Sequence, residues 1–144
     1  MNAPAKICDI HHKLTAAGLR PTRQRIALGG LLFGSGDRHV TAEDLHAEAE
    51  RAGVKVSLAT VYNTLHQFTA AGLLREVAIE GSKTYFDTNT ADHYHFYIEN
   101  DGELIDIDEE LCIGQLPEVP AGKRVSRVDV LIRLVDSTED KSGG

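Results

Sequence analysis

The chain has 144 residues, of which 42% are hydrophobic and 26% are charged, and its formal net charge is −7. This length suits one domain or two small ones, and the composition is that of a globular protein. No apolar run approaches the roughly 20 residues that cross a bilayer, and the N-terminus lacks the apolar stretch of a secretory signal. Cys8 and Cys112 form neither a C-x-x-C pair nor a disulfide framework, so we expect a cytoplasmic protein without membrane contact.

Charge is distributed unevenly along the chain. Residues 1–34 contain five basic residues and one acidic residue, whereas residues 88–144 contain thirteen acidic and five basic residues. Affinity for DNA comes largely from cations placed on phosphates, so the negative total argues against nucleic acid. The basic N-terminal part still allows one half of the molecule to face an anion. A solvated basic helix would give the same counts, and charge alone leaves both interpretations open.

Three helices are predicted in the first half of the chain. The first follows Pro21-Thr22, with Thr22 as its N-cap or in its first turn. Thr41 is the predicted N-cap of the second helix, and Ser57 is the predicted N-cap of the third. Glycines mark the three ends, at Gly34, Gly53 and Gly72.

Gly29 and Gly30 lie in the middle of the first predicted helix. Each glycine there costs about 1 kcal/mol relative to alanine. Either neighbouring packing compensates for this cost, or another element approaches the helix closely at these positions.

Residues 73–87 are predicted to form two short strands around Glu80-Gly81-Ser82. Three helices followed by such a hairpin are the order of a winged helix-turn-helix, whose last helix enters the major groove. A helical protein-interaction module with a polar surface helix is the alternative, and Tyr62 has packing as a competing role. Side chains suited to phosphates and base edges are the candidate DNA contacts: Arg20, Arg23, Ser57, Thr60, Tyr62, Asn63 and Thr64.

Beyond Asp87 the hydrophobic period changes to two. If Asp101-Gly102 forms a two-residue turn, His95 faces Asp108 and Tyr97 faces Asp106 on neighbouring strands. One side of the hairpin is then apolar, and the other carries the polar set His93, His95, Tyr97, Asp106 and Asp108. Imidazole with carboxylate suits Fe²⁺, Mn²⁺ or Zn²⁺. Solvated strand histidines beside an acidic rim are the alternative.

The segments "LATVYNTL", "GSKTYFD", H-x-H and "GELIDI" together resemble the ferric uptake regulator (Fur) family over about residues 10–135. The resemblance implies an α+β fold, with a winged helix-turn-helix DNA-binding domain at 1–87, a hinge at 88–92 and an α/β dimerisation and metal-sensing domain at 93–136. We expect residues 137–144 to be disordered and 125–135 to supply a central strand of the dimer sheet. The implied function is that of a transcription regulator, not an enzyme, which binds palindromic operator DNA as a homodimer or tetramer.

The resemblance also implies a regulatory metal site between the two domains. The positions that match its ligands are His39, Asp87, His93, His95 and Asp106. Fe²⁺ or Mn²⁺ is the expected ion, with Zn²⁺ binding in vitro. The C-x-x-C of the family's structural zinc site is replaced here by "IEND" at 98–101.

The missing cysteines, "DTNTADHYHF" and the short end "GKRVSRVDVLIRLV" make the chain most similar to the iron response regulator (Irr) branch. That branch implies a regulator, mainly a repressor, of iron and haem homeostasis genes. Haem is then a further expected ligand, with His93, His95 and Tyr94 as candidates. Asp87 and Asp106 also resemble the family's peroxide sensors, which is the first alternative; a small metal-dependent hydrolase is the second.

Overall fold

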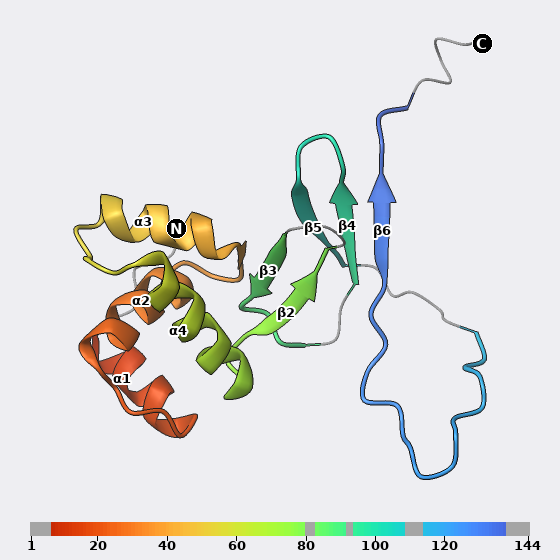
Figure 1. The fold of residues 1–144 in the computed structure, drawn as a ribbon, viewed down its shortest axis with the longest axis horizontal. Helices are drawn as coiled ribbons and strands as arrows, with labels where there is room; N and C mark the ends of the chain where they lie inside the picture. Colours follow the sequence, from red (N-terminus) through yellow and green to blue (C-terminus); the bar gives the residue numbers. More distant parts are fainter. Residues whose placement is uncertain (1–6, 80–82, 92–93, 109–113, 138–144) are drawn as a thin grey trace. The chain divides into compact units, whose positions relative to one another are not determined.

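The computed structural model describes residues 7–79, 83–91, 94–108 and 114–137. The chain divides into two compact units, Met1–Thr90 and Ala91–Gly144. Among the described residues, helices occur only in the first unit, and no helix is long and apolar enough to cross a membrane. The elements in chain order (Figure 1) are α1 (Ile7–Ala16), α2 (Arg23–Phe33), β1 (His39–Val40), α3 (Ala42–Arg51), α4 (Leu58–Ala70), β2 (Arg75–Ala78), β3 (Thr84–Asp87), β4 (Tyr94–Ile98), β5 (Glu103–Ile107) and β6 (Leu131–Leu134).

The three predicted helices begin where their capping residues place them. Thr22 caps α2 with its side chain, which resolves the choice between a cap and the first turn. Thr41 and Asp44 form a capping box at α3, in which each side chain accepts a backbone N–H of the other residue. Ser57 caps α4 by accepting the N–H of Thr60 at 3.1 Å. These hydrogen bonds satisfy N–H groups that have no partner within the helix.

Helix α1 was not assigned from the sequence, and it contributes to the core of the first unit. Ile10 and Leu14 on α1 are 1% and 0% exposed. They belong to one cluster with residues from α2, α3, α4 and the small sheet. The remaining members of that buried cluster are Leu28, Leu32, Val40, Ala42, Leu45, Ala49, Val61, Leu65, Phe68, Leu74 and Phe86.

The two glycines inside α2 have different surroundings. A Cβ on Gly29 would lie 2.9 Å from Cγ2 of Ile10 on α1, whereas a Cβ on Gly30 would meet no heavy atom within 4 Å. Close approach of α1 therefore explains Gly29, and nothing in the structure explains Gly30.

Alanine at these two positions is expected to change stability in opposite directions. Gly29→Ala forces a methyl group against the buried, β-branched Ile10, and overpacking of this kind costs about 1–3 kcal/mol, more than the gain in helix propensity. Gly30→Ala gains helix propensity without a clash, so it is expected to stabilise the unit by about 0.5–1 kcal/mol. Urea unfolding followed by circular dichroism measures both variants. Equal midpoints for the two variants would contradict the close approach of α1.

The sheet of the first unit has three strands in the order β1-β3-β2. Strands β2 and β3 form the predicted hairpin, whose turn at 80–82 lies outside the described residues. The two-residue strand β1 was not predicted, and it pairs antiparallel with β3 so that Val40 lies opposite Phe86. Both of these side chains belong to the buried core. Their neighbours in the strands, His39 and Asp87, therefore point to the opposite face of the sheet.

The second unit contains a three-stranded sheet in the order β5-β4-β6. Strands β4 and β5 are antiparallel, with His95 opposite Asp106 and Ile98 opposite Glu103. The predicted register, in which His95 faces Asp108, is therefore wrong by two residues. A shift of two leaves every side chain on its predicted face, so His95 and Asp106 remain on one side.

The turn between β4 and β5 explains the difference in register. The N–H of Gly102 donates to the carbonyl of Ile98 at 2.8 Å and closes a four-residue loop. The two-residue turn typical of Asp-Gly needs positive φ at both positions. Gly102 has φ 69°, but among the described residues no residue other than glycine has positive φ. Asp101 therefore does not adopt that turn.

Strand β6 is shorter than the predicted strand at 125–135 and comprises Leu131–Leu134. It runs parallel to β4 and forms an edge of the sheet within this chain. A central position in a dimer sheet stays a prediction. Residues 138–144 of the expected disordered tail lie outside the described residues.

Candidate functional site

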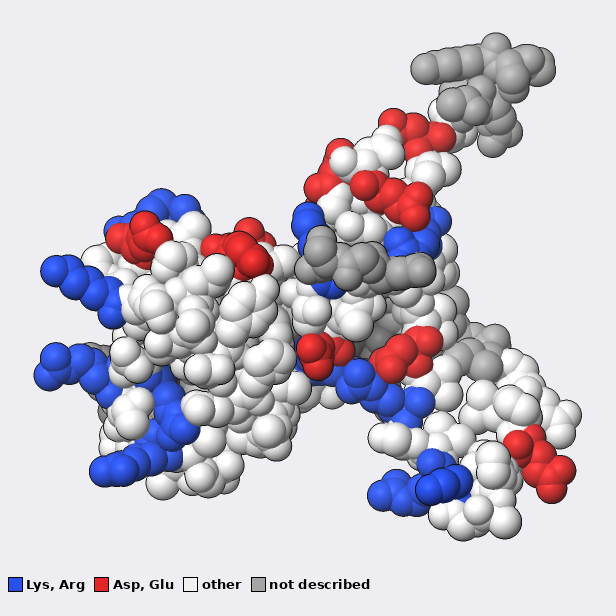
Figure 2. Space-filling model, in the orientation of Figure 1, with Lys and Arg blue, Asp and Glu red and all other residues white. Residues whose placement is uncertain are grey.

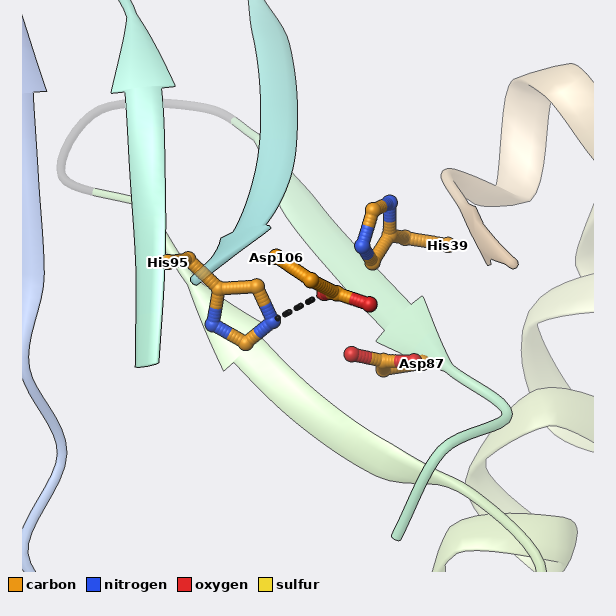
Figure 3. Close-up of side chains that lie close together, drawn as sticks. All are labelled: His39, Asp87, His95 and Asp106. Atoms are coloured by element: carbon orange, nitrogen blue, oxygen red, sulfur yellow. Dashed lines mark ion pairs between the residues drawn. The ribbon is translucent and has the colours of Figure 1, made fainter. Parts of the chain in front are cut away.

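His39 and Asp87 form a facing pair in the first unit. They are direct partners across β1 and β3, so their side chains lie on the same face of the sheet (Figure 3). Asp87 is fully buried, and its Oδ1 accepts the backbone N–H of Asn89 at 2.9 Å. Arg75 occupies the register position opposite Asp87 on β2. Donors and cations of this kind are what a buried carboxylate requires, because burial disfavours its charge.

Arg38 holds the strand that carries His39. Its carbonyl accepts the N–H of Thr88 at 2.9 Å, and its own N–H donates to the Thr88 hydroxyl at 2.8 Å. Its guanidinium donates to the carbonyl of Leu31 and to both carboxylate oxygens of Glu48 on α3. A bidentate pair of this type fixes orientation as well as distance. The short strand β1 is thus attached to β3, α2 and α3.

His95 and Asp106 form the corresponding pair in the second unit. Nε2 of His95 lies 3.2 Å from Oδ1 of Asp106, and the dashed line in Figure 3 marks this ion pair. His95 is 4% exposed, whereas Asp106 is partly exposed. This contact places a nitrogen of the imidazole and an oxygen of the carboxylate side by side, as candidate donors on one face of the sheet. His93, the other half of the H-x-H, lies outside the described residues.

Tyr94 points away from this pair. It is opposite Ile107 in the sheet, and consecutive residues of a strand project to opposite faces. His95 and Tyr94 therefore cannot ligate the same haem iron from this strand. Of the described haem candidates, one or the other could serve, but not both together.

The described candidate ligands are His39, Asp87, His95 and Asp106, and each offers one donor atom. In each unit, an imidazole nitrogen and a carboxylate oxygen, without thiolate, are donors that suit Fe²⁺, Mn²⁺ or Zn²⁺. Imidazole and carboxylate donors bind these ions reversibly, in a pH-dependent way, because the imidazoles must be neutral to ligate. The residues present therefore suit a divalent-metal site.

An open polar cleft of about 390 Å³ lies between the start of α2 and the side of α4 in the first unit. Arg25 crosses it: Nε and Nη2 donate to Oε1 of Gln67, and Nη1 donates to the carbonyl of Arg20. The cleft is lined by Arg20, Thr22, Gln24, Arg25, Thr60, Asn63, Thr64 and Gln67. Four of these residues were not among the predicted DNA contacts: Thr22, Gln24, Arg25 and Gln67. The helical spacing of Gln67, seven residues after Thr60, was the signal that placed it on the same face.

The predicted DNA contacts on α4 differ in how accessible they are. Asn63 is exposed to solvent, whereas Thr64 is buried, with only 5% of its surface exposed. The Ser57 hydroxyl donates to Oγ1 of Thr60 at 2.9 Å, so these two side chains already hydrogen-bond each other. Tyr62 is half-buried, and its hydroxyl donates to Glu43 on α3.

Basic side chains project from one side of the first unit. Figure 2 shows several Lys and Arg side chains on its left-hand side, whereas the Asp and Glu side chains visible at its top lie beside further basic side chains. Arg20 and Arg23 are both exposed, although Arg23 does not line the cleft. A basic surface beside a polar helix is the electrostatic feature expected of a nucleic-acid-binding face.

A winged helix with a polar last helix, followed by a small sheet unit, with one facing imidazole–carboxylate pair in each unit, defines a metal-responsive DNA-binding regulator. The sequence model of the Ferric uptake regulator family matches residues 16–135. The chain belongs to this family. Family membership confirms the α+β fold class and the prediction that the protein is a transcription regulator and not an enzyme, so the hydrolase alternative is set aside. Regulators of this family bind DNA and are dimeric.

Individual relatives agree with this assignment. The chain is 30% identical to the Ferric uptake regulation protein of Vibrio vulnificus over 135 residues, covering 93% of this chain and 91% of that protein. It is 39% identical to the Peroxide operon regulator of Bacillus subtilis over 93 residues, which are 65% of this chain and 63% of that protein. The ferric uptake regulator of Pseudomonas aeruginosa, solved with manganese, matches with a TM-score of 0.67 at 26% identity, covering 88% of this chain and 97% of that one.

Proposed function

We propose that this chain is a metal- and haem-responsive transcriptional regulator, mainly a repressor, of iron and haem homeostasis genes. It binds palindromic operator DNA in the cytoplasm as a homodimer, with a tetramer as the larger assembly. The observation that carries the proposal is that each unit holds a facing imidazole–carboxylate pair, His39 with Asp87 and His95 with Asp106.

Metal sensing in this proposal uses ligands from both units. His39 and Asp87 belong to the DNA-binding domain (1–87), whereas His93, His95 and Asp106 belong to the dimerisation domain (93–136). A bound Fe²⁺ or Mn²⁺, or Zn²⁺ in vitro, supplies the positive charge that these donors share. Residues 88–92 act as the hinge. Binding shifts the arrangement of the two domains only by the difference in metal affinity between arrangements.

DNA recognition in this proposal uses α4 and the basic residues near the start of α2. Thr60, Tyr62 and Asn63 face the major groove, with Ser57 and Thr64 beside them. Arg20 and Arg23 contact phosphates or the minor groove. The polar cleft and the exposed guanidinium groups support this assignment, because phosphate contacts supply most of the affinity and base contacts supply specificity.

Haem is proposed as a second signal, as the similarity to the iron response regulator branch suggests. Imidazole and phenolate are both established haem-iron ligands. The candidates are His93, His95 and Tyr94, of which His95 and Tyr94 act on opposite faces of β4 and are alternatives to each other.

A DNA shift assay on an AT-rich inverted-repeat duplex, titrated separately with Mn²⁺, Fe²⁺ and haem, tests the proposed function. We expect metal and haem each to change the affinity of the full chain for DNA by at least about fivefold, which is the usual lower range of coupling between sites. The same titration on a duplex of scrambled sequence is the control. Identical DNA affinity in all arms, with and without each ligand, would contradict the proposal.

A peroxide sensor is the second candidate function. Aspartates at both Asp87 and Asp106 and the similarity to the Bacillus subtilis peroxide regulator favour it. Mass spectrometry of the iron-loaded protein after peroxide treatment separates the two. One added oxygen atom on a ligand histidine supports the peroxide sensor, and unmodified histidines support the iron and haem response.

A further inference from the structure

The phenol of Tyr62 on α4 is held by the first turn of α3. Its Oη lies 3.0 Å from Oε2 of Glu43. The ring stacks on His66 one turn later, with centroids 6.3 Å apart and planes at 19°. His66 in turn meets the buried Phe86 edge-on at 5.5 Å. The tyrosine is therefore fixed at both its hydroxyl and its ring.

The direction of this hydrogen bond follows from the chemistry of the two groups. An ionised carboxylate only accepts hydrogen bonds, so the phenol must donate its single proton to Glu43. The hydrogen bond to Glu43, desolvation and the negative charge of Glu43 together raise the pKa of Tyr62 above its ordinary value. The phenol therefore keeps its proton at neutral pH, and that proton is directed at Glu43.

We propose that Glu43 determines the base specificity of Tyr62, because it accepts the hydrogen bond of the phenol O–H and leaves only the oxygen lone pairs of Tyr62 for DNA. The inference rests on the proposed role of α4 in the major groove. An oxygen that can only accept pairs with the exocyclic amino groups of adenine and cytosine, N6 and N4. It disfavours base pairs that place an acceptor, such as guanine O6 or thymine O4, at the same point. The remaining carboxylate oxygen of Glu43 has the same preference for amino donors.

Without Glu43 the phenol can rotate its hydroxyl and either donate or accept. Glu43→Ala is therefore expected to broaden the preference at one base-pair position of each half-site, by about tenfold for one neutral hydrogen bond. Tyr62→Phe removes the hydroxyl and is expected to weaken the preference at that same position. Glu43→Gln retains an acceptor but adds an N–H₂ group, and it is expected to lie between wild type and Glu43→Ala.

Glu50→Ala is the matched control. Glu50 is an exposed acid on the same helix, and its carboxylate lies 3.3 Å from His46 instead of Tyr62. Removing it changes the charge of α3 by the same amount and leaves the Glu43–Tyr62 hydrogen bond in place. We expect Glu50→Ala to prefer the same sequence as wild type.

Selection from a pool of duplexes with randomised inverted repeats, using the full chain with and without Mn²⁺, tests the inference. The expected result is a shared altered position in Glu43→Ala and Tyr62→Phe, where wild type requires an amino group. A wild-type motif that persists unchanged in Glu43→Ala would overturn the role of Glu43 and leave the proposed function standing. If wild type itself selects no motif under either condition, the proposed DNA recognition fails and the inference fails with it.

Discussion

His95→Ala is expected to lower the affinity of the full chain for Mn²⁺ at least about tenfold, because groups that merely support a ligand already contribute 10–100-fold. His95 is 4% exposed, and its Nε2 is oriented by Asp106. Its loss removes a nitrogen donor from the proposed set and the 3.2 Å contact between Nε2 and the Asp106 carboxylate. Isothermal titration calorimetry measures the metal affinity. The metal-dependent part of DNA affinity should fall in parallel in a shift assay.

Two further variants make this prediction specific. Asp106→Asn keeps the size of the side chain but removes the anionic donor, so it should also weaken Mn²⁺ binding. His12→Ala removes an exposed imidazole from α1, in the other unit, and should leave the affinity unchanged. Wild-type affinity in both His95→Ala and Asp106→Asn would rule out the second unit as a source of metal ligands.

The helices of the first unit could be predicted from the sequence because their signals are local. Thr41 followed by Asp44, and Ser57 at the start of an apolar stripe, are capping signals that involve residues three apart. Helix α1 has a weaker signal. In the described part of α1, only Ile10 and Leu14 mark its buried side. Their burial depends on packing against α2, which the sequence of α1 alone does not show.

The strands are harder to predict from the sequence, because they form by pairing with partners that are distant in the chain. β1 has two residues, and it exists because His39 and Val40 pair with β3 almost fifty residues later. No local pattern predicts such a strand, since a two-residue segment has no periodicity to detect. The family resemblance, and not any strand signal, predicts His39 as a ligand.

The β4–β5 hairpin shows which part of a register a sequence determines. Alternation assigned His95 and Asp106 to one face, and the structure agrees. Which residue lies opposite which depends on the loop, and the dipeptide Asp101-Gly102 predicts a two-residue turn that the structure does not have. A hydrogen bond from Gly102 to Ile98 makes the loop two residues longer. Alternation is therefore informative about the face, whereas the loop decides the pairing.

Phe86→Ala is expected to destabilise the first unit by about 3–5 kcal/mol, the usual cost of deleting a buried aromatic ring. The side chain is 0% exposed, belongs to the main core cluster and contacts the ring of His66 on α4. A domain of this size is stable by about 5–15 kcal/mol in total. Urea unfolding followed by helical circular dichroism reports this unit selectively, because the described helices all lie within it. Phe86→Leu, which leaves a smaller void, is the matched control and should cost less.

This variant also separates loss of stability from loss of a ligand. Phe86 faces the core from β3, and its neighbour Asp87 projects from the other face of the same strand. Unfolding of the unit therefore removes the His39–Asp87 pair and the α4 surface together, so metal and DNA affinity should fall in proportion to the unfolded fraction. His95→Ala should instead weaken metal binding while the helical unfolding midpoint stays at the wild-type value. If Phe86→Ala loses less than about 1 kcal/mol, the ring is not the link between the sheet and α4.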